Sequence, residues 1–498
     1  MKNILHYLVL FFFLGIISCT KVPQQEDALK KAAIFSAYVN GVQMTTAKAV
    51  DGVSVEGVVF DLEFSTEIDI DKFDPSLIVF SGGPLEVSLG GNEKTLRLEP
   101  VNALKPFTSY TLNVLALEQL GVSVVEPYRY TIVTALDTSD KFERISDEEL
   151  LTLIQEKTFR YFWDYAHPVS GLARERLNSG ETVTSGGSGF GIMAIPVGIE
   201  RGFITREEGA QRMLDIVTFL DEKAERFHGA YSHWLDGTTG KAIQFGAKDD
   251  GADLVETGFL IEGLLTVQQY FNLDNPVETG IRQKITKIWE EVEWDWFFRN
   301  DALYWHWSKE YDWKMNHKIR GFDETFSTYV LGVSSPTHPI SPKVYEACYK
   351  DSPIYFNGKE YYGVKLDLGM EYGGPLFFTH YSFIGLDPRA LNVDGFNLYE
   401  RNKAHSLIHY NYAIDNPKGH EGLGADLWGF TSSDDPLVGY TSHHPNTDAE
   451  NGTVSPTAAV SSIVYTPEES LGVIRHLYYD LGPKVFGKYG FYDAYNPS

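Results

Sequence analysis

The alternation of apolar and polar positions changes its period once, near residue 140. Before that point, residues 58–64 (VVFDLEF), 95–100 (TLRLEP) and 128–133 (YRYTIV) alternate in the way that half-buried strands do. Turn residues such as the Asp-Pro-Ser of 74–76 separate them. Short strands at regular spacing predict an all-β sandwich over residues 34–135, followed by a linker at 136–144.

From residue 145 onward the apolar positions recur with a helical period. Ser146 with Glu149, and Thr205 with Glu208, have the spacing of capping boxes, and Thr466 with Glu469 adds Pro467 at the first helical position. The pattern predicts helices at 146–162, 205–220, 253–271, 277–292, 323–333, 342–350, 398–414 and 466–481, with shorter ones at 190–199, 375–384 and 455–464.

These eleven or so helices are joined by long loops rich in Gly, Trp and Tyr, and long loops in a compact domain are usually functional. An (α/α)6 toroid, with six inner and six outer helices, accounts for the helix count of residues 145–498. A helical bundle with decorated loops is the alternative.

The N-terminus has the pattern of an export signal. Lys2 precedes an apolar run at 8–17 that is too short to span a bilayer as a helix. The run leads into Ser18 and Cys19, which predicts a lipoprotein signal at residues 1–18, a lipidated Cys19 and a polar tether over 19–33; an ordinary signal peptide is the alternative. We therefore expect an exported lipoprotein, periplasmic or at the cell surface, anchored to the outer membrane by lipid alone. Cys348 is then the only remaining cysteine and is predicted to be a buried thiol.

Charge and motifs exclude several classes of function. A net charge of −26 disfavours nucleic acid as a partner, because phosphates would be repelled. The chain has no GxGxxG opening a helix after a strand, no GxxxxGK[ST] and no HExxH. The Gly-Gly-Ser-Gly-Phe of 186–190 lacks the last glycine of a nucleophile elbow. We expect neither a cofactor nor a metal.

Aromatic residues make up 14% of the chain, and many lie among carboxylates between residues 294 and 324. Flat rings can stack on the apolar faces of sugars while acids bind the hydroxyls at their edges. The pattern favours a glycan site over rings that only fill the core, because the polar tips of buried Trp and Tyr need partners.

Two acidic segments have the composition of a general acid/base site. The first acidic segment has four acids within eight residues: Asp249, Asp250, Asp253 and Glu256. In a continuous helix, residues 249, 253 and 256 would share one face, where repulsion between the carboxylates would raise the pKa of at least one of them. The alternative is that Asp253 and Glu256 form a capping box.

The second acidic segment is 320–326, in which Glu324 lies between aromatic residues. Arg320 is nearby, and Asp323 could simply cap a helix. Glu324 is then either a first-turn acid that the helix dipole tolerates or an acid in a half-apolar pocket. A third segment, 421–429, places Asp426 and Trp428 among glycines, where they could contact sugar or merely begin a helix.

Several motifs together resemble one family. They are Ser188–Ala194 (SGFGIMA), the acids of 249–256, Gly321–Glu324 (GFDE), Gly422–Trp428 (GLGADLW) and Tyr489–Asn496 (YGFYDAYN). They are similar to the glucoamylase-like domain that defines glycoside hydrolase family 144. The resemblance covers about residues 145–498 and implies an (α/α)6 toroid that hydrolyses β-1,2-glucan, endo-acting or releasing sophorose, with inversion. The segment 34–135 resembles bacterial immunoglobulin-like modules. The order of the segments, with a lipoprotein signal first, this module second and the glucoamylase-like domain last, resembles that of lipoproteins in Bacteroidetes glycan-use systems.

The resemblance also implies roles for individual residues. Glu324 is the expected general acid and Asp249 the expected base, with Asp253 and Glu256 orienting substrate or tuning charge; the alternative is that Glu256 and Glu324 exchange roles. Inversion needs room for a water, so the acid and the base should lie roughly 6.5–9.5 Å apart. The candidates for stacking are Trp234, Trp305, Trp307, Tyr311 and Trp428. The candidates for hydroxyl contacts are His233, Arg320, His380, Asp426 and His443.

Two other functions compete with a β-glucan hydrolase. A non-catalytic glycan-binding lipoprotein would share the aromatic residues but would not need paired acids. An α-glucan hydrolase on the same toroid would differ only in its substrate. The paired acids favour an enzyme.

Overall fold

The computed structural model describes residues 30–72, 75–115, 122–124 and 127–497. The predicted signal 1–18 and Cys19 lie outside the described residues. The chain divides into two compact units, Met1–Ala135 and Leu136–Ser498, which matches the predicted boundary. No helix in the described part of the chain is long and apolar enough to cross a membrane.

The first unit consists of two main sheets around a single core. Antiparallel pairing orders one sheet as β3-β2-β5-β8-β7, and the other has the order β4-β11-β9-β6, in which only β11 and β4 are parallel. The bounds are β2 Ile34–Val39, β3 Val42–Met44, β4 Val50–Val53, β5 Phe60–Phe64, β6 Ile78–Phe80, β7 Leu85–Leu89, β8 Thr95–Pro100, β9 Ser109–Val114 and β11 Tyr128–Thr134. Phe60, Leu62 and Phe64 point into the core, so the alternation predicted for residues 58–64 is confirmed.

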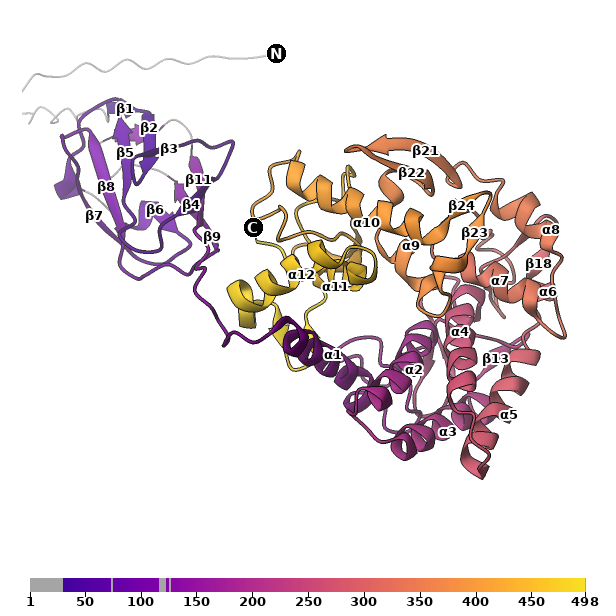
Figure 1. The fold of residues 1–498 in the computed structure, drawn as a ribbon. Coiled ribbons are helices and arrows are strands. Elements are labelled where there is room, and N and C mark those ends of the chain that lie inside the picture. Colours follow the sequence, from indigo (N-terminus) through magenta and orange to yellow (C-terminus); the bar gives the residue numbers. More distant parts are fainter. Residues whose placement is uncertain (1–29, 73–74, 116–121, 125–126, 498) are drawn as a thin grey trace, which may run out of the picture. The chain divides into compact units, whose positions relative to one another are not determined.

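The second unit is mainly helical, and its helices follow one another around the domain in chain order (Figure 1). The α-helices are α1 Asp147–Asp164, α2 Ser185–Glu200, α3 Arg206–Glu222, α4 Leu254–Tyr270, α5 Pro276–Glu290, α6 Trp294–Phe297, α7 Phe326–Ser334, α8 Pro342–Val344, α9 Phe377–His380, α10 Leu398–Asp415, α11 Pro456–Ser461 and α12 Pro467–Arg475. The capping boxes at Ser146 and Thr205 are both formed, as predicted.

Two helix starts agree with the sequence only in part, and a third is wrong. The helix predicted from residue 253 does begin there, with Asp253 as the N-cap of α4, but residues 249–253 do not extend it into one helical face, because Ala252 and Asp253 form the short strand β17. The helix predicted from residue 323 begins at Phe326, so that Asp323 and Glu324 lie in the preceding loop. Thr466 precedes α12 but makes no capping hydrogen bond with its side chain, so only Pro467 of that prediction is confirmed.

Helices α2 and α4 cross at very close range because glycines line their contact. A Cβ on Gly189 would lie 2.2 Å from the carbonyl oxygen of Phe259, and a Cβ on Gly263 would lie 2.3 Å from the carbonyl oxygen of Gly189. Both distances are shorter than side-chain contacts permit, so backbone packs directly on backbone. This contact fixes the position of the N-terminus of α4, where the acidic cluster begins.

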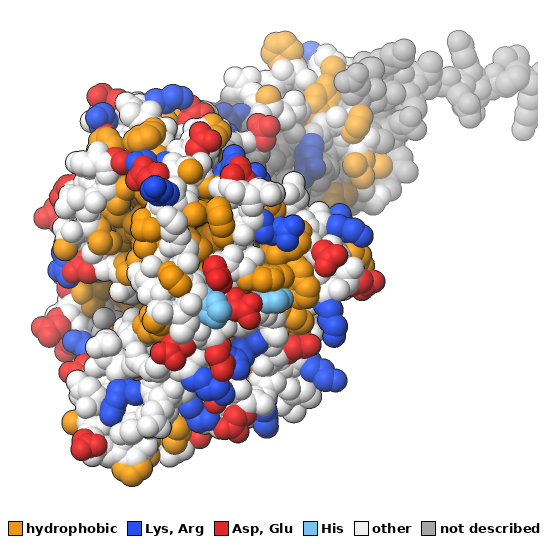
Figure 2. Space-filling model, turned by 90° about the vertical axis from the view of Figure 1, so that its right-hand side faces the viewer, with side chains coloured by type: hydrophobic (Ala, Val, Ile, Leu, Met, Phe, Trp, Pro, Cys, Tyr) orange, Lys and Arg blue, Asp and Glu red, His pale blue; other side chains and the backbone are white. Residues whose placement is uncertain are grey.

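The surface shown in Figure 2 carries both signs of charge. Lys and Arg side chains are interspersed with Asp and Glu around apolar patches, and no continuous basic area covers this face. The distribution agrees with the acidic composition of the chain and offers nothing on this face for a phosphate backbone to bind.

We expect Gly263→Ala to destabilise the helical unit by about 1–3 kcal/mol, because the added methyl group must push α2 and α4 apart. Thermal unfolding measures the effect. Gly280→Ala in α5 is the matched control, since its Cβ would lie 3.4 Å from Leu214 Cδ1, an ordinary contact, and alanine is the better helix former. Equal melting temperatures for the two variants would contradict the close crossing.

Candidate active site

The pairing of two short strands builds the acidic cluster. Strand β17 (Ala252–Asp253) runs antiparallel to β20 (His306–Trp307), and the register places Asp253 directly opposite His306. Asp253 is also the N-cap of α4, where its Oδ1 accepts hydrogen bonds from the backbone amides of Val255 and Glu256 at 3.0 and 2.9 Å. One carboxylate thus serves the helix with one oxygen and the site with the other.

Two histidines face the other oxygen of Asp253. His233 Nδ1 lies 3.3 Å from Asp253 Oδ2, and His306 Nε2 lies 3.5 Å from both Asp253 Oδ2 and Asp249 Oδ2. Burial alone would raise the pKa of Asp253, but hydrogen bonds from the two histidines outweigh it and lower that pKa. Burial likewise lowers the pKa of His233, yet the charges of Glu256 and Asp253 raise it to about 9. Around neutral pH, Asp253 is therefore an ion-paired anion.

Asp249 and Glu256 behave differently from Asp253. Burial, followed by repulsion from Asp253, raises the pKa of Asp249 to about 6. The same two causes raise the pKa of Glu256 to about 7, the charge of His233 opposing them. Glu256 does not reach back to cap the helix; its Oε2 accepts a hydrogen bond from the backbone amide of Gly186 at 3.1 Å. Only glycine allows this approach, because a Cβ at residue 186 would lie 2.1 Å from that oxygen.

Glu324 approaches the cluster from the loop before α7. Its backbone carbonyl accepts a hydrogen bond from Ser382 Oγ, which in turn accepts one from the backbone amide of Ser327 at 3.0 Å. Burial, then repulsion from Asp323 and from Glu256, holds the pKa of Glu324 well above its usual range. Its buried Oε2 has no hydrogen-bond partner in the protein. The raised pKa favours the protonated form of this side chain, which keeps one carboxyl oxygen without a partner in the protein.

Aromatic side chains surround the cluster. His233 stacks on Phe245 with the ring centroids 3.9 Å apart, and Phe245 also contacts Trp234 edge-on at 4.8 Å. Trp305 stacks on His317 at 4.7 Å. The indole nitrogens of Trp234 and Trp305 are buried and have no hydrogen-bond partner in the protein.

Some predicted contact residues lie outside the cluster. Trp428 is fully buried and packs edge-on against Tyr410, so it cannot stack on a sugar. His443 is also buried, with Nε2 3.0 Å from Asp435 and Nδ1 donating to the Ala449 carbonyl at 2.7 Å. Both predictions are wrong because burial, which sequence spacing does not reveal, has given these side chains a structural role.

Two other predicted contact residues have partners within the protein. Arg320 pairs with Asp301 at 3.3 Å rather than with Glu324. His380 contacts Ser462 Oγ at 3.2 Å, and its burial lowers its pKa to about 4.

The remaining predicted residues lie on different elements. Asp426 is exposed, near Gly472 of α12. Tyr311 lies in the turn after β20, its backbone amide bonded to Ser308 Oγ. Trp307 packs against Trp296 at 5.5 Å, on the strand that carries His306.

Sequence reasoning missed three members of the site. His306 was recognised only as a hydrogen-bonding histidine, although its strand pairing makes it the partner of Asp249 and Asp253. Asp323 was taken as a helix cap, whereas burial raises its pKa to about 6 and its charge acts on Glu324. Phe245 carries the stacking contact with His233. The cue for His306 was its position between Trp305 and Trp307 in a short alternating segment.

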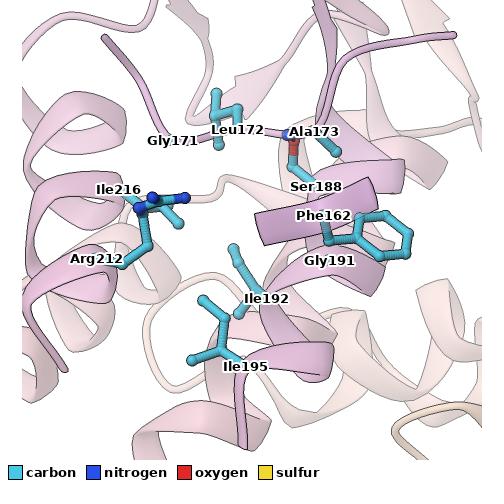
Figure 3. Close-up of a pocket in the computed structure, with 10 residues that line it drawn as sticks. All are labelled: Phe162, Gly171, Leu172, Ala173, Ser188, Gly191, Ile192, Ile195, Arg212 and Ile216. Atoms are coloured by element: carbon cyan, nitrogen blue, oxygen red, sulfur yellow. Dashed lines mark hydrogen bonds between the residues drawn. The ribbon is translucent and has the colours of Figure 1, made fainter. Parts of the chain in front are cut away.

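A small cavity between α2 and α3 is distinct from this cluster (Figure 3). Its polar lining consists of Ser188 and Arg212, and both already have partners. Ser188 Oγ accepts from the Ala173 amide at 2.9 Å, and Arg212 Nη1 donates to the Trp163 carbonyl at 3.2 Å. The cavity is a packing feature of the helices and holds no free reactive group.

His233, Asp249 and Asp253 also satisfy the geometry of a metal-ligand set. One ligand atom from each lies within 4.8 Å of the others. Each carboxylate already faces a histidine that balances its charge. The cluster is therefore an ion-paired network of side chains.

Comparison with known proteins identifies the family. The Glycoamylase family model, which describes a glucoamylase, matches residues 316–498. A crystal structure described as that of a glucoamylase from Bacteroides uniformis is 53% identical, with a TM-score of 0.70, over 71% of this chain and 87% of that one. The protein belongs to the glucoamylase-like family.

Two further relatives of this glucoamylase-like protein have named activities. The endo-beta-1,2-glucanase of Chitinophaga pinensis, solved with sophorotriose and glucose, is 47% identical with a TM-score of 0.69, over 71% of this chain and 87% of that one. An exo beta-1,2-glucooligosaccharide sophorohydrolase of Parabacteroides distasonis is 45% identical over 399 residues, 74% of this chain and 55% of that protein. The chain thus spans about half the length of this curated relative.

We expect Asp253→Ala to lower the pKa of His233 from about 9, because the hydrogen bond and one of the raising charges are lost while burial remains. Titration of histidine side chains by NMR measures the shift. Asp426→Ala, which removes an exposed carboxylate outside the cluster, should leave that pKa unchanged. An unchanged His233 pKa in Asp253→Ala would refute the ion pair.

Proposed function

We propose that the protein is a glycoside hydrolase that cleaves β-1,2-glucan by general acid/base catalysis with inversion. The observation that carries the proposal is the pairing of Glu324, whose pKa is held well above its usual range and whose Oε2 has no partner in the protein, with a separate cluster of acids. A hydrolase needs one carboxyl that stays protonated and another that stays ionised at the same pH, and environments that separate two pKa values provide both. The β-1,2-glucan specificity draws on the relatives whose names carry it.

In this mechanism Glu324 protonates the glycosidic oxygen and Asp249 removes a proton from the attacking water, directly or through a substrate hydroxyl. Asp249 suits this role because its pKa of about 6 leaves it ionised, yet basic, at neutral pH. Asp253 keeps His233 and His306 charged and in place, and Glu256 orients substrate from its anchor on Gly186. Trp234 and Trp305 supply the free N–H donors for hydroxyl groups.

The finer architecture belongs to the same proposal. We infer that the helical unit is an (α/α)6 toroid and that the β-unit is an immunoglobulin-like spacer. We also infer a signal at 1–18 and a lipid on Cys19 that holds the enzyme at the outer membrane, facing the periplasm or the cell exterior. The apolar run at 8–17 and the Ser18–Cys19 junction support this placement.

Incubation with linear β-1,2-glucan, laminarin, cellulose oligomers and starch, followed by chromatography of the products, tests the reaction. The protein without residues 1–19 should release sophorose or its short homologues from β-1,2-glucan alone. Glucose from starch would instead assign an α-glucan hydrolase. Binding of β-1,2-glucan without any product would assign a glycan-binding protein.

Glu324→Gln should lower kcat on β-1,2-glucan by about 10²–10⁴-fold, because glutamine cannot donate the proton. Glucan binding, measured by calorimetry, should remain. The matched control is Glu371→Gln, an exposed carboxylate that pairs with Lys359 on the surface. Full activity in Glu324→Gln would remove this residue from the mechanism.

The pH profile should distinguish the two candidate bases. A base works only when ionised, so log(kcat/KM) should rise by about one unit per pH unit up to pH 6 if Asp249 is the base, whose raised pKa is about 6. If Glu256 were the base, log(kcat/KM) would instead continue to rise up to about pH 7 before it levels off. The activity should fall again above the raised pKa of Glu324, where this acid loses its proton. A profile that already levels off near pH 4 would rule out both Asp249 and Glu256 as the base.

A further inference from the structure

A buried acid in the middle of α4 has no role in the mechanism described above. Glu262 is only 4% exposed, and its Oε1 accepts a hydrogen bond from the backbone amide of Gly385 at 3.1 Å. Burial raises the pKa of Glu262 to about 8, which favours its neutral form. Because a buried polar group is costly unless it is hydrogen-bonded, the bond to Gly385 is the feature that needs a reason.

The contact between Glu262 and Gly385 is too close for a side chain to enter. A Cβ on Gly385 would lie 2.5 Å from Glu262 Cγ and 2.7 Å from its Oε1. Gly385 follows the short 3₁₀ helix η6 (Tyr381–Phe383), whose first residue also packs on α4. The ring of Tyr381 meets that of Phe259 edge-on, with the centroids 5.5 Å apart. The segment 381–385 is therefore fastened to α4 at both of its ends.

The middle of this segment holds the backbone of the proposed acid. Ser382 is fully buried, and its Oγ donates to the backbone carbonyl of Glu324 and accepts from the backbone amide of Ser327 at 3.0 Å. The first amides of a helix have no partner within that helix, and the N-cap of α7, Thr325, makes no capping bond with its side chain. Ser382 supplies this cap from a distant part of the chain. One hydroxyl thus fixes the start of α7 and the main chain of Glu324 together.

The segment 381–385 also connects Glu324 to the acidic cluster, because the N-terminus of α4 belongs to that cluster. Asp253 is the N-cap of α4, and Glu256 lies in its first turn. The connection runs along α4, across the segment and through Ser382 to Glu324. Inversion needs the acid and the base held roughly 6.5–9.5 Å apart, so that a water fits between them. A rigid link between α4 and the loop before α7 provides such a fixed separation.

We propose that Ser382 and Glu262 are positioning residues of the hydrolase: Ser382 places Glu324 relative to the acids on α4, and Glu262 holds Ser382 in place through the amide of Gly385. The inference rests on the proposed function and deepens it, because it names the groups that keep the acid and the base at a working separation. Glu262 contributes a hydrogen-bond acceptor and transfers no proton. Its replacement by a neutral acceptor should therefore be tolerated, whereas the loss of the acceptor should not.

Ser382→Ala tests the link to Glu324. We expect kcat on β-1,2-glucan oligomers to fall about 10–100-fold, because a shift of about 1 Å in a catalytic group has an effect of this size. KM, and oligomer binding measured by calorimetry, should change little, since the groups that contact the glucan remain. The rise of log(kcat/KM) should still end near pH 6, because the surroundings of Asp249 are untouched. A general loss of structure would instead weaken binding or move this limb.

Ser406→Ala is the matched control for Ser382→Ala. Ser406 is another fully buried serine, on α10, and its Oγ contacts the carbonyl of Asn402 at 3.2 Å and Ser462 Oγ at 3.3 Å rather than the loop of Glu324. Its loss should lower the melting temperature, as the loss of Ser382 does, and leave kcat unchanged. Equal losses of kcat in the two variants would assign the effect to stability and overturn the inference.

Two substitutions of Glu262 test the other end of the link. Glu262→Gln keeps an oxygen that can accept from the amide of Gly385 and should retain most of kcat, whereas Glu262→Leu removes the acceptor and should lower kcat with little change in KM. Gly385→Ala perturbs the same contact from the opposite side, since its methyl group must displace Glu262 or the segment. A loss in Glu262→Gln as severe as that in Glu262→Leu would contradict the positioning role, because the acid itself would then be required.

The outcomes separate this inference from the proposed function. Unchanged kcat in both Ser382→Ala and Glu262→Leu, in a protein that hydrolyses β-1,2-glucan, would overturn the inference and leave the proposed function standing. If one of these variants does not fold, the other and Gly385→Ala carry the same test. A wild-type protein that cleaves no β-1,2-glucan would fail the proposed function itself, and the inference with it.

Discussion

The charge of one buried carboxylate, Asp253, organises the site around it. Its Oδ1 begins α4 by accepting two backbone hydrogen bonds, and its Oδ2 faces two histidines. A buried anion without partners would be strongly unfavourable, so Asp253 requires β20 to run alongside β17 and bring His306 opposite it. Together with Glu256, the anion raises the pKa of His233, and its repulsion adds to burial in raising the pKa values of Asp249 and Glu256. The chemistry proposed for Asp249 depends on burial and on this ionised neighbour.

Much of this architecture follows from local signals in the sequence. Alternation identified the strands of the first unit, and capping residues identified the starts of α1 and α3, because both patterns report contacts within a few residues. The acids of 249–256 and Glu324 were also found, since crowded like charges are unusual away from a function. Their arrangement was not, because residues 249–253 form a turn and a strand rather than a helical face.

The corrections at Trp428 and His443 share a physical cause. Both side chains suit a sugar, and only tertiary contacts decide whether they face a ligand or the protein. The same limit applies to contacts between distant segments. The ion pair of Arg176 with Asp434 and the hydrogen bond from the Asp434 amide to Asp493 join segments more than three hundred residues apart, and no periodicity records such a meeting.

The glycine-lined crossing of α2 and α4 has a consequence for how such a site can change over generations. Gly186 anchors Glu256 through a backbone amide, and Gly189 sets the separation of the two helices three residues later. The position of this acid is thus set by main-chain atoms, which are the same whatever side chains fill the surrounding core. Substitutions elsewhere in that core can accumulate as neutral drift without moving the carboxylate, whereas the glycines leave no room for variation. The domain can diverge widely in sequence and still inherit one arrangement of acids.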